Sequence, residues 1–571
     1  MRLNTIRHVF TFLFLLLALD LFYLQIIRGG YFARQSRNNS RRVISFDGPR
    51  GNILDRNGIV LAESRKTFDA AIIPQDSTAK GRQAIFKFLS GALGIESGVL
   101  ERRYARGRAS PYTPVPVLTG LDREQAILVT EGAFFHPGLV ILEDYKRRYP
   151  RRDVGSHLLG YAAAVDARRM KDLINNGDPV PGLVGYTGVE EGFDEDLRGI
   201  PGGREVEVNS RGREVRVLTL RDPAPGADIV LTIDQRIQQI AYDVLGGRRG
   251  AFVMIDVASA EVVAMLSAPS FDPNAFSSGE GIDDVSAYLK DTRSPMINRA
   301  YAAAFQPGSV FKIPVSFGGL QERKITAGTE FDCPGFFVLG SRRYQFPHAF
   351  GRQDLVRALG HSANEFFFHT GFLLGSEKLA EYARKFGLGE RTGIPVPYES
   401  KGNVPVRSSY RNWYQGDTAN MSIGQGDVLS TPLQLARMMA ALETRGRLQT
   451  PCLVSAVGSR GDLCAGAAKS ARQLVFRNEV WDIVLKGLSL VVDMPSGTAH
   501  QLKMDGLTTY GKTGTAQTGA GREDHAWFAG VTRSSSGRFA YCFFLEHGGS
   551  SANAVSAVRE ILEQMRAANL I

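Results

Sequence analysis

A serine and a lysine three residues apart are the side chains of this sequence best suited to nucleophilic chemistry. They are Ser309 and Lys312, which lie in AFQPGSVFKIP (304–314) directly behind a Pro-Gly bend. Residues i and i+3 of a helix share one face, so the lysine amine can reach the serine hydroxyl. A serine hydroxyl is a weak nucleophile until a neighbouring base takes its proton, and a neutral amine can do so. The pair therefore predicts a lysine-activated serine.

The spacing of this pair does not establish a site by itself. With 38 Ser and 15 Lys in 571 residues, about one Ser-x-x-Lys is expected by chance. Two occur, because Ser77-Thr78-Ala79-Lys80 also fits.

Two further short motifs follow the first in a fixed order. Ser362-Ala363-Asn364 lies in LGHSANEFFFH, and Lys512-Thr513-Gly514 lies in YGKTGTAQTG. The middle motif is weak, since 36–38 and 551–553 also read Ser-x-Asn, whereas Lys-Thr-Gly occurs once. All three motifs, in this order, form the pattern known from class A β-lactamases and penicillin-binding proteins.

The region around these motifs reads as an antiparallel sheet with helices on its faces. In PGADIVLTIDQRIQQIAYDVL (225–245), a strand leads through Asp234, a plausible N-cap, into an amphipathic helix. A closing helix is expected from about Ala552. Because strands at both ends flank helices, we expect an α+β domain over 229–571. The apolar strand runs are 250–267, 526–532 and 538–548.

The stretch before this domain, residues 28–228, is rich in Arg and Gly and broken by turns. GPRGNILDRNGIVLAE (48–63) reads as two strands around an Asn57-Gly58 hairpin turn, and 204–218 alternates as a second strand pair. A helical run lies near Asp122 to Thr130. These features predict an extended α+β pedestal with little catalytic content.

The N-terminus carries an apolar run of 19 residues, Val9 to Ile27, long enough to cross a bilayer. No small-residue cleavage site follows it, so we expect an uncleaved signal anchor preceded by a cytoplasmic tail, residues 1–8. Asp20 within the run either faces a partner helix or lies near the interface, because a carboxylate at mid-membrane costs about 2.5–3.5 kcal/mol.

Composition excludes some classes of function. The net charge is +10, but the basic residues are dispersed, with local arginine clusters at 34–42 and 147–152. Nucleic-acid binding needs the charge gathered on one module, so these clusters fit an anionic membrane or polymer better.

Of the four cysteines, Cys452 and Cys464 are close enough to bridge a hairpin in an oxidising compartment; two unpaired thiols are the alternative. The other two are Cys333 and Cys542.

Nearly end to end, the chain resembles the class B penicillin-binding proteins. The resemblance is strongest to the cell-elongation branch, supported by EVNSRGREVRVL (207–218), with the division type as the near alternative. The other segments similar to family boxes are RGNILDRNG (50–58), RRYP (147–150), HLLGY (157–161), GYTGVEEGFDEDLRG (185–199) and GQGDVLSTPLQLA (424–436).

The resemblance implies D,D-transpeptidation: a D-Ala-D-Ala stem peptide acylates Ser309, and the amine of a second stem resolves the acyl-enzyme into a cross-link. Lys312 is expected to act as the base if burial and a second cation keep it neutral, and Lys512 can supply that cation. Ser362 would relay the proton to the leaving amine. Pro314, five residues after the nucleophile, is expected to bend a regular helix.

The remaining site residues are expected to bind substrate. Asn364 would hold the peptide amide, and Thr513 of the Lys-Thr-Gly motif, which ends at Gly514, would help Lys512 bind the substrate carboxylate. Backbone N–H groups of Ser309 and Thr515 would form the oxyanion hole.

No metal or other cofactor is expected. Some elongation-type relatives bind zinc between the first two motifs, with a cysteine in the middle of the second motif, where this chain has Ala363. The polar residues of that stretch, read as a loop of satisfied side chains, are Asp332, Cys333, His348, Asp354 and His361.

The resemblance also implies partners and a location. The expected partners are peptidoglycan stem peptides, β-lactam antibiotics, a multi-span SEDS glycosyltransferase and the elongation complex. The expected location is the inner membrane, with the catalytic domain on the periplasmic side. Five arginines follow the apolar run while Arg2 and Arg7 precede it, so the positive-inside rule alone favours the opposite orientation.

Three other functions are weighed against transpeptidation. A β-lactamase would need a deacylating Glu after the second motif, and the stretch around Glu390 has no clear signature of one. A β-lactam sensor would need more membrane spans and a cytoplasmic effector. A bifunctional polymerase would need a paired-Glu glycosyltransferase motif in the pedestal.

Overall fold

The computed structural model describes residues 2–32, 41–107, 111, 113–176, 182–208, 214–277, 282–464, 471–519 and 521–571. Two compact units alternate along the chain. The first consists of Met1–Arg50, Ser64–Lys146 and Gly199–Gly226, and the second of Gly51–Glu63, Arg147–Arg198 and Ala227–Ile571. The division into a pedestal at 28–228 and a catalytic domain at 229–571 stays a prediction.

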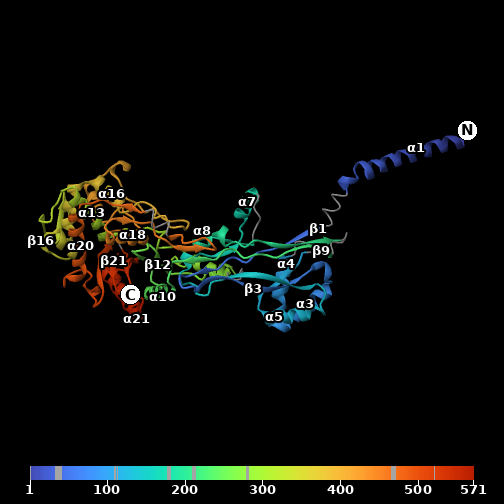
Figure 1. The fold of residues 1–571 in the computed structure, drawn as a ribbon, viewed down its shortest axis with the longest axis horizontal. Helices are drawn as coiled ribbons and strands as arrows, with labels where there is room; N and C mark the ends of the chain where they lie inside the picture. Colours follow the sequence, from blue (N-terminus) through green and yellow to red (C-terminus); the bar gives the residue numbers. More distant parts are fainter. Residues whose placement is uncertain are drawn as a thin grey trace. The chain divides into compact units, whose positions relative to one another are not determined.

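The first unit begins with a long apolar helix, shown in dark blue in Figure 1. It consists of α1 (Arg2–Phe22) and one π-helical turn, η1 (Tyr23–Ile27). Within the described residues, one helix, Leu3–Ile27, is long and apolar enough to cross a membrane, with a mean hydropathy of 2.2. The expected span Val9–Ile27 lies within it, and so does Asp20.

The rest of the first unit is a small α+β fold. Helix α5 (Arg123–Ala133) confirms the expected helical run, and its capping box joins Asp122 and Gln125. The strand pair expected at 204–218 is also present, as β8 and β9, while its turn residues lie outside the described ranges. The other elements are β1 (Arg41–Phe46), β3 (Val60–Ile72), η2 (Pro74–Asp76), α3 (Ala79–Leu93), α4 (Ser97–Gly107), β4 (Val115–Leu121), β5 (Leu139–Arg148), β8 (Gly202–Val208) and β9 (Glu214–Arg221).

The second unit is built on a five-stranded antiparallel sheet in the order β12-β11-β22-β21-β20. This confirms the fold expected from the apolar runs at the two ends of the domain. Its strands are β11 (Gly250–Asp256), β12 (Val262–Ala268), β20 (Thr508–Ala516), β21 (His525–Arg533) and β22 (Arg538–Leu545).

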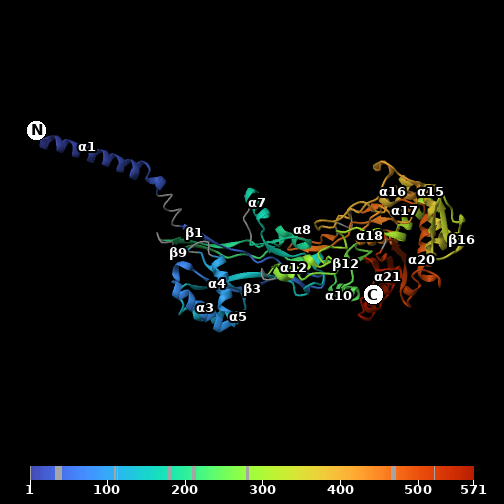
Figure 2. The ribbon, with the colours of Figure 1, turned by 180° about the vertical axis from the view of Figure 1, so that it is seen from behind.

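Helices cover both faces of this sheet, which explains why β11, β12 and β22 are largely apolar. Along β11, Val253 faces one hydrophobic core and Phe252 faces the other, because successive side chains of a strand point to opposite faces. Helices α10 (Gln235–Leu245) and α21 (Ser551–Ala567) pack on one face and lie side by side in Figures 1 and 2. The predicted N-cap Asp234 starts α10 by accepting the N–H of Arg236.

The opposite face carries the helices that hold the first two motifs, together with α18; the third motif lies in β20 itself. These helices are α13 (Lys312–Gln321), α14 (Leu355–His361), α15 (Asn364–Leu374) and α18 (Pro432–Glu443). The remaining helices of this unit are α6 (Ser156–Leu159), α7 (Ala167–Asn176), α8 (Gly188–Gly192), α9 (Asp194–Leu197), α11 (Asn274–Ser277), α12 (Ile282–Lys290), η3 (Gly308–Phe311), α16 (Ser376–Lys385), η4 (Arg407–Ser409), α17 (Gln415–Ser422), α20 (Asn478–Asp493) and η5 (His500–Leu502). The remaining strands are β2 (Ile53–Leu54), β6 (Ala162–Ala164), β7 (Leu183–Gly185), β10 (Ile229–Leu231), β13 (Glu330–Cys333), β14 (Phe336–Leu339), β15 (Arg342–Gln345), β16 (Gly351–Asp354), β17 (Arg447–Leu448), β18 (Val454–Val457) and β19 (Arg472–Gln473).

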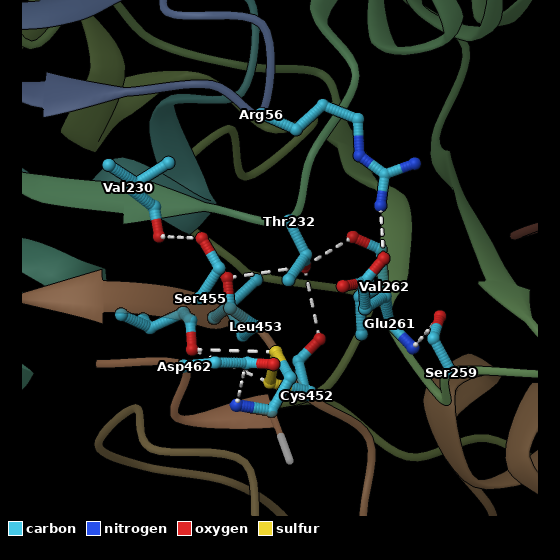
Figure 3. Close-up of a disulfide and its surroundings, with 12 residues drawn as sticks. Arg56, Val230, Thr232, Ser259, Glu261, Val262, Cys452, Leu453, Ser455 and Asp462 are labelled. Atoms are coloured by element: carbon cyan, nitrogen blue, oxygen red, sulfur yellow. Dashed lines mark hydrogen bonds and ion pairs between the residues drawn. A yellow bond between two sulfur atoms is a disulfide. The ribbon is translucent and has the colours of Figure 1, made fainter.

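Cys452 and Cys464 form a disulfide, which decides between the two alternatives left open by the sequence (Figure 3). Their Cα atoms are 5.5 Å apart, within the usual range for a bridge. Beside the bridge, the Thr232 hydroxyl donates to the carbonyl oxygens of Val262 (2.8 Å) and Cys452 (3.0 Å), so the bridge is anchored to the main sheet. Cys333 and Cys542 are buried free thiols.

Candidate active site

The first motif spans a junction between two kinds of helix. Ser309 lies in the 3-10 helix η3, and the α-helix α13 begins at Lys312. Since a 3-10 helix has three residues per turn, Ser309 and Lys312 are aligned on one face. Pro314 was expected to bend a regular helix that ran through it from Ser309. The structure has no such regular helix, because Pro314 falls in the first turn of α13, where a backbone N–H has no helical partner.

Lys312 is fully buried against the second motif. Its Nζ donates to the Ser362 carbonyl oxygen (2.7 Å), to Ser362 Oγ (3.3 Å) and to Asn364 Oδ1 (2.6 Å). This arrangement depends on backbone geometry, because Ser362 ends α14 in the left-handed conformation (φ +61°) and Asn364 then opens α15. The sharp turn between the two helices presents both side chains to the lysine.

Lys512 approaches the same serine from the edge strand β20. Its Nζ donates to Ser362 Oγ at 2.8 Å and to Thr513 Oγ1 at 3.4 Å. The Ser362 hydroxyl therefore lies between two lysine amines, as a proton relay requires. Thr513 is in turn hydrogen-bonded to Thr498, with 2.8 Å between the two hydroxyl oxygens.

Burial sets the charge states of the two lysines. Desolvation, followed by the nearby Lys512 cation, holds the pKa of Lys312 well below its usual 10.5. Burial also lowers the pKa of Lys512, to about 7. The lowered pKa of Lys312 favours the neutral amine that a general base needs. Within the described residues, Ser309 Oγ makes no hydrogen bond, so its hydroxyl can turn toward Lys312.

Two glycines bring the backbone of the nucleophile against β20. Gly308 has φ +53°, and a Cβ at this position would lie 2.6 Å from the Thr515 carbonyl oxygen. A Cβ at Gly514 would lie 2.7 Å from the carbonyl oxygen of Pro307. The Gly308 N–H donates to the Gly424 carbonyl oxygen at 3.0 Å. Only glycine permits this approach, which an oxyanion hole shared by Ser309 and Thr515 requires.

The structure separates the motif from its chance matches. Ser77 is buried and donates to the Ile73 carbonyl oxygen at 3.2 Å, while Lys80 is exposed to solvent. Ser551 opens α21, and residues 36–38 lie outside the described ranges.

The polar stretch between the first two motifs is held by protein contacts. Asp354 caps α14 by accepting the N–H of Arg357, and His361 is hydrogen-bonded to Gln353 and Ser496. Burial raises the pKa of the Cys333 thiol to about 12, which disfavours the thiolate that a metal needs. Among the described residues, no group of three His, Cys, Asp or Glu could hold a metal ion.

Sequence reasoning missed two members of the site. Thr498 comes from the loop after α20, 15 residues before its partner Thr513. Gln425 lies in the family-like segment 424–436, and its Nε2 donates to the Thr515 carbonyl oxygen at 3.3 Å. The sequence did not identify it as a site residue. For Thr498, nothing in a single sequence distinguishes it from other threonines.

Comparisons with known proteins agree with this geometry. The model of the penicillin binding protein transpeptidase domain matches residues 250–564, and that of the penicillin-binding protein dimerisation domain matches residues 45–231. Peptidoglycan D,D-transpeptidase MrdA from Escherichia coli strain K12 is 30% identical over 96% of this chain and 91% of its own length. The Haemophilus influenzae protein of the same name is 29% identical over 95% and 88%.

Solved structures agree over nearly the whole length. The penicillin-binding protein (PBP2) of Helicobacter pylori, in a complex with MreC, superposes with a TM-score of 0.79 at 25% identity, covering 93% of this chain and 99% of that one. A chain from a peptidoglycan synthase complex that coordinates polymerization and crosslinking superposes with a TM-score of 0.72 at 30% identity, covering 98% and 97%.

Proposed function

The chain belongs to the penicillin-binding proteins, and we propose on that basis that it is the peptidoglycan D,D-transpeptidase of cell elongation, inhibited by β-lactams. The observation that carries this proposal is the Ser362 hydroxyl held between the two buried lysines Lys312 and Lys512, with Ser309 one 3-10 turn before Lys312. This arrangement suits acyl transfer, because it can move a proton from nucleophile to leaving group.

In the acylation step, neutral Lys312 accepts the proton of Ser309 as Oγ attacks the carbonyl carbon of the penultimate D-Ala. The C–N bond to the last D-Ala then breaks, and the proton passes from Lys312 through Ser362 to the leaving nitrogen. The distances of 3.3 Å from Lys312 Nζ and 2.8 Å from Lys512 Nζ to Ser362 Oγ support this relay.

The other site residues orient the substrate. Lys512, Thr513 and Thr498 bind the terminal carboxylate, since their polar atoms converge at one end of the site. Asn364 holds the peptide amide. Backbone N–H groups of Ser309 and Thr515 stabilise the oxyanion, and Gly514 lets β20 lie close enough for this.

The β-lactamase alternative gains no support from Glu390. Its carboxylate forms ion pairs with Arg437 (3.4 Å) and Arg472 (3.0 Å), so it is held by cations rather than poised as a base for deacylation.

Labelling with a fluorescent penicillin tests the proposed function. We expect a stable adduct that persists for hours, because a transpeptidase site excludes the water that would hydrolyse the ester. Release of the opened penicillin within seconds would contradict a transpeptidase and favour a β-lactamase.

The two lysines predict a bell-shaped pH dependence of penicillin acylation. Lys312 must be neutral, so activity falls when low pH protonates it. Lys512 must be charged, and because burial lowers its pKa to about 7, the second-order acylation rate of the free enzyme should fall as pH rises above about 7. Lys512→Arg keeps the positive charge at this position and should remove the fall of the acylation rate above about pH 7. If the rate of Lys512→Arg still fell above about pH 7, the proposal that Lys512 must be positively charged would be contradicted.

The chain is a single-pass membrane protein, and we propose that its catalytic domain lies on the periplasmic side of the inner membrane. The Cys452–Cys464 disulfide supports this orientation, because disulfides persist in oxidising compartments. The five arginines that follow the span favour the opposite orientation, but the positive-inside rule describes only a bias in short loops. We therefore give the disulfide more weight than these arginines.

We further propose that Asp20 contacts a SEDS-type glycosyltransferase within the membrane. An all-apolar helix would anchor the chain better, so a carboxylate in α1 needs another role, and a polar contact between helices is worth about 0.6–2 kcal/mol. Asp20→Leu should weaken co-purification with that polymerase and leave membrane anchoring and penicillin acylation unchanged. Unchanged co-purification with normal wall growth would remove Asp20 from the interface.

A further inference from the structure

A groove leads away from the end of the site where Thr498 contacts Thr513. Thr498, His500, Lys503, Asp505 and Arg559 line a cavity of about 690 Å³ between the loop after α20 and helix α21. A second cavity of about 730 Å³ shares Lys503, Asp505 and Arg559 with the first and extends it to Arg566. We call the two cavities together the Lys503 groove. Thr498, which lines the first of them, is hydrogen-bonded to Thr513, with 2.8 Å between the two hydroxyl oxygens.

The donor peptide cannot fill this groove. In the proposed function, on which this inference rests, the donor ends at the carboxylate bound by Lys512, Thr513 and Thr498. A D-Ala-D-Ala stem has no atoms beyond that carboxylate. Whatever occupies the Lys503 groove during the reaction therefore arrives with the second substrate.

The second substrate must approach along this direction. Attack by the acceptor amine on the acyl-enzyme is the reverse of the expulsion of D-Ala, so the incoming nitrogen follows the path by which the leaving nitrogen departed. The amine nitrogen bonds to the acyl carbon, the bond from that carbon to Ser309 Oγ breaks, and the amine proton passes by Ser362 and Lys312 to Ser309 Oγ. The rest of the acceptor then extends from the position of the departed D-Ala.

Three cations, Lys503, Arg559 and Arg566, and two carboxylates, Asp505 and Glu563, line the groove, so its side chains leave an excess of positive charge for an acidic peptide. Arg559 is held by Glu563 (2.7 Å) and by the Gln501 carbonyl oxygen (3.2 Å). Lys503 is exposed, and among the described residues its amine has no hydrogen-bond or ion-pair partner. An unpaired cation beside a fixed arginine would attract a carboxylate.

We propose that the Lys503 groove binds the acceptor stem peptide, with Lys503 pairing with one of its carboxylates. Lys503 is then a specificity-determining residue for the second half of the reaction. It has no role in the first half, because the donor does not reach it.

Partitioning of the acyl-enzyme between two acceptors tests this proposal. The full-length protein is acylated with a D-alanyl thioester, and transfer is measured to D-alanine and to the stem tripeptides L-Ala-γ-D-Glu-L-Lys and L-Ala-γ-D-Glu-meso-diaminopimelate. Lys503→Glu should lower transfer to the better tripeptide about tenfold, since charge reversal turns an attraction into a repulsion. Transfer to D-alanine and penicillin acylation should not change, and Lys503→Arg should retain tripeptide transfer.

Lys486→Glu is the matched control, because Lys486 is an exposed lysine on α20 that lines neither cavity. It should leave all rates unchanged. The proposal is overturned if Lys503→Glu transfers normally to the tripeptides, or if it loses transfer to D-alanine in equal measure. Failure of the unsubstituted protein to react with thioester and penicillin would instead overturn the proposed function.

Discussion

Replacing Lys312 by alanine should lower the rate of penicillin acylation by about 10²–10⁴-fold, the usual contribution of a general base. Lys312 is the buried amine aligned with Ser309, and burial lowers its pKa, which favours the neutral form. Ser362→Ala should cost less, because a water molecule can replace part of a relay hydroxyl between two amines. Stopped-flow acylation rates for the two variants give the comparison.

Lys80→Ala is the control for this experiment, since it removes the lysine of the chance Ser-x-x-Lys match and should change nothing. A larger loss in Ser362→Ala than in Lys312→Ala would transfer the role of base to Ser362.

Gly308→Ala should lower the acylation rate by about 10²–10³-fold, the typical effect of losing one oxyanion donor. The new Cβ would lie 2.6 Å from the Thr515 carbonyl oxygen, so β20 must move away from Ser309. The backbone N–H groups of Ser309 and Thr515 would then no longer converge on one oxygen atom. Acylation rate and melting temperature should be measured together.

Gly506→Ala separates this clash from backbone strain. Gly506 also has a positive φ (+76°), but no atom lies within 4 Å of a Cβ built there. It should lose less stability than Gly308→Ala, because it adds backbone strain without a clash, and it should keep its acylation rate. Equal acylation rates in both variants would argue against the close approach of Gly308 to Thr515.

The sequence predicted the parts of this molecule that depend on local pattern. Strands β11 and β22 are largely apolar because helices cover both faces of their sheet, so the run of apolar residues identified them. Asp234 was recognisable as an N-cap because capping needs only a side chain and a nearby N–H. The three motifs were recognisable because each is only three or four residues long and the chemistry requires particular residue types at its positions.

Long-range geometry could not be derived in the same way. The hydrogen bond between Thr498 and Thr513 depends on how the loop after α20 returns to β20, and no local pattern encodes it. The switch from a 3-10 to an α-helix at Lys312 reverses the expected effect of Pro314, because a proline is harmless in a first turn and disruptive later. Pairing of Cys452 with Cys464 likewise depends on chain geometry that the 12-residue spacing only permits.

The central claim is that Ser309 is the acylated nucleophile. Its most direct test is intact mass spectrometry of the penicillin-treated protein, followed by peptide mapping of the adduct. We expect one added penicillin per chain, located on the peptide that contains Ser309 and absent from Ser309→Ala. An adduct on Ser77, or an adduct that persists in Ser309→Ala, would contradict the account.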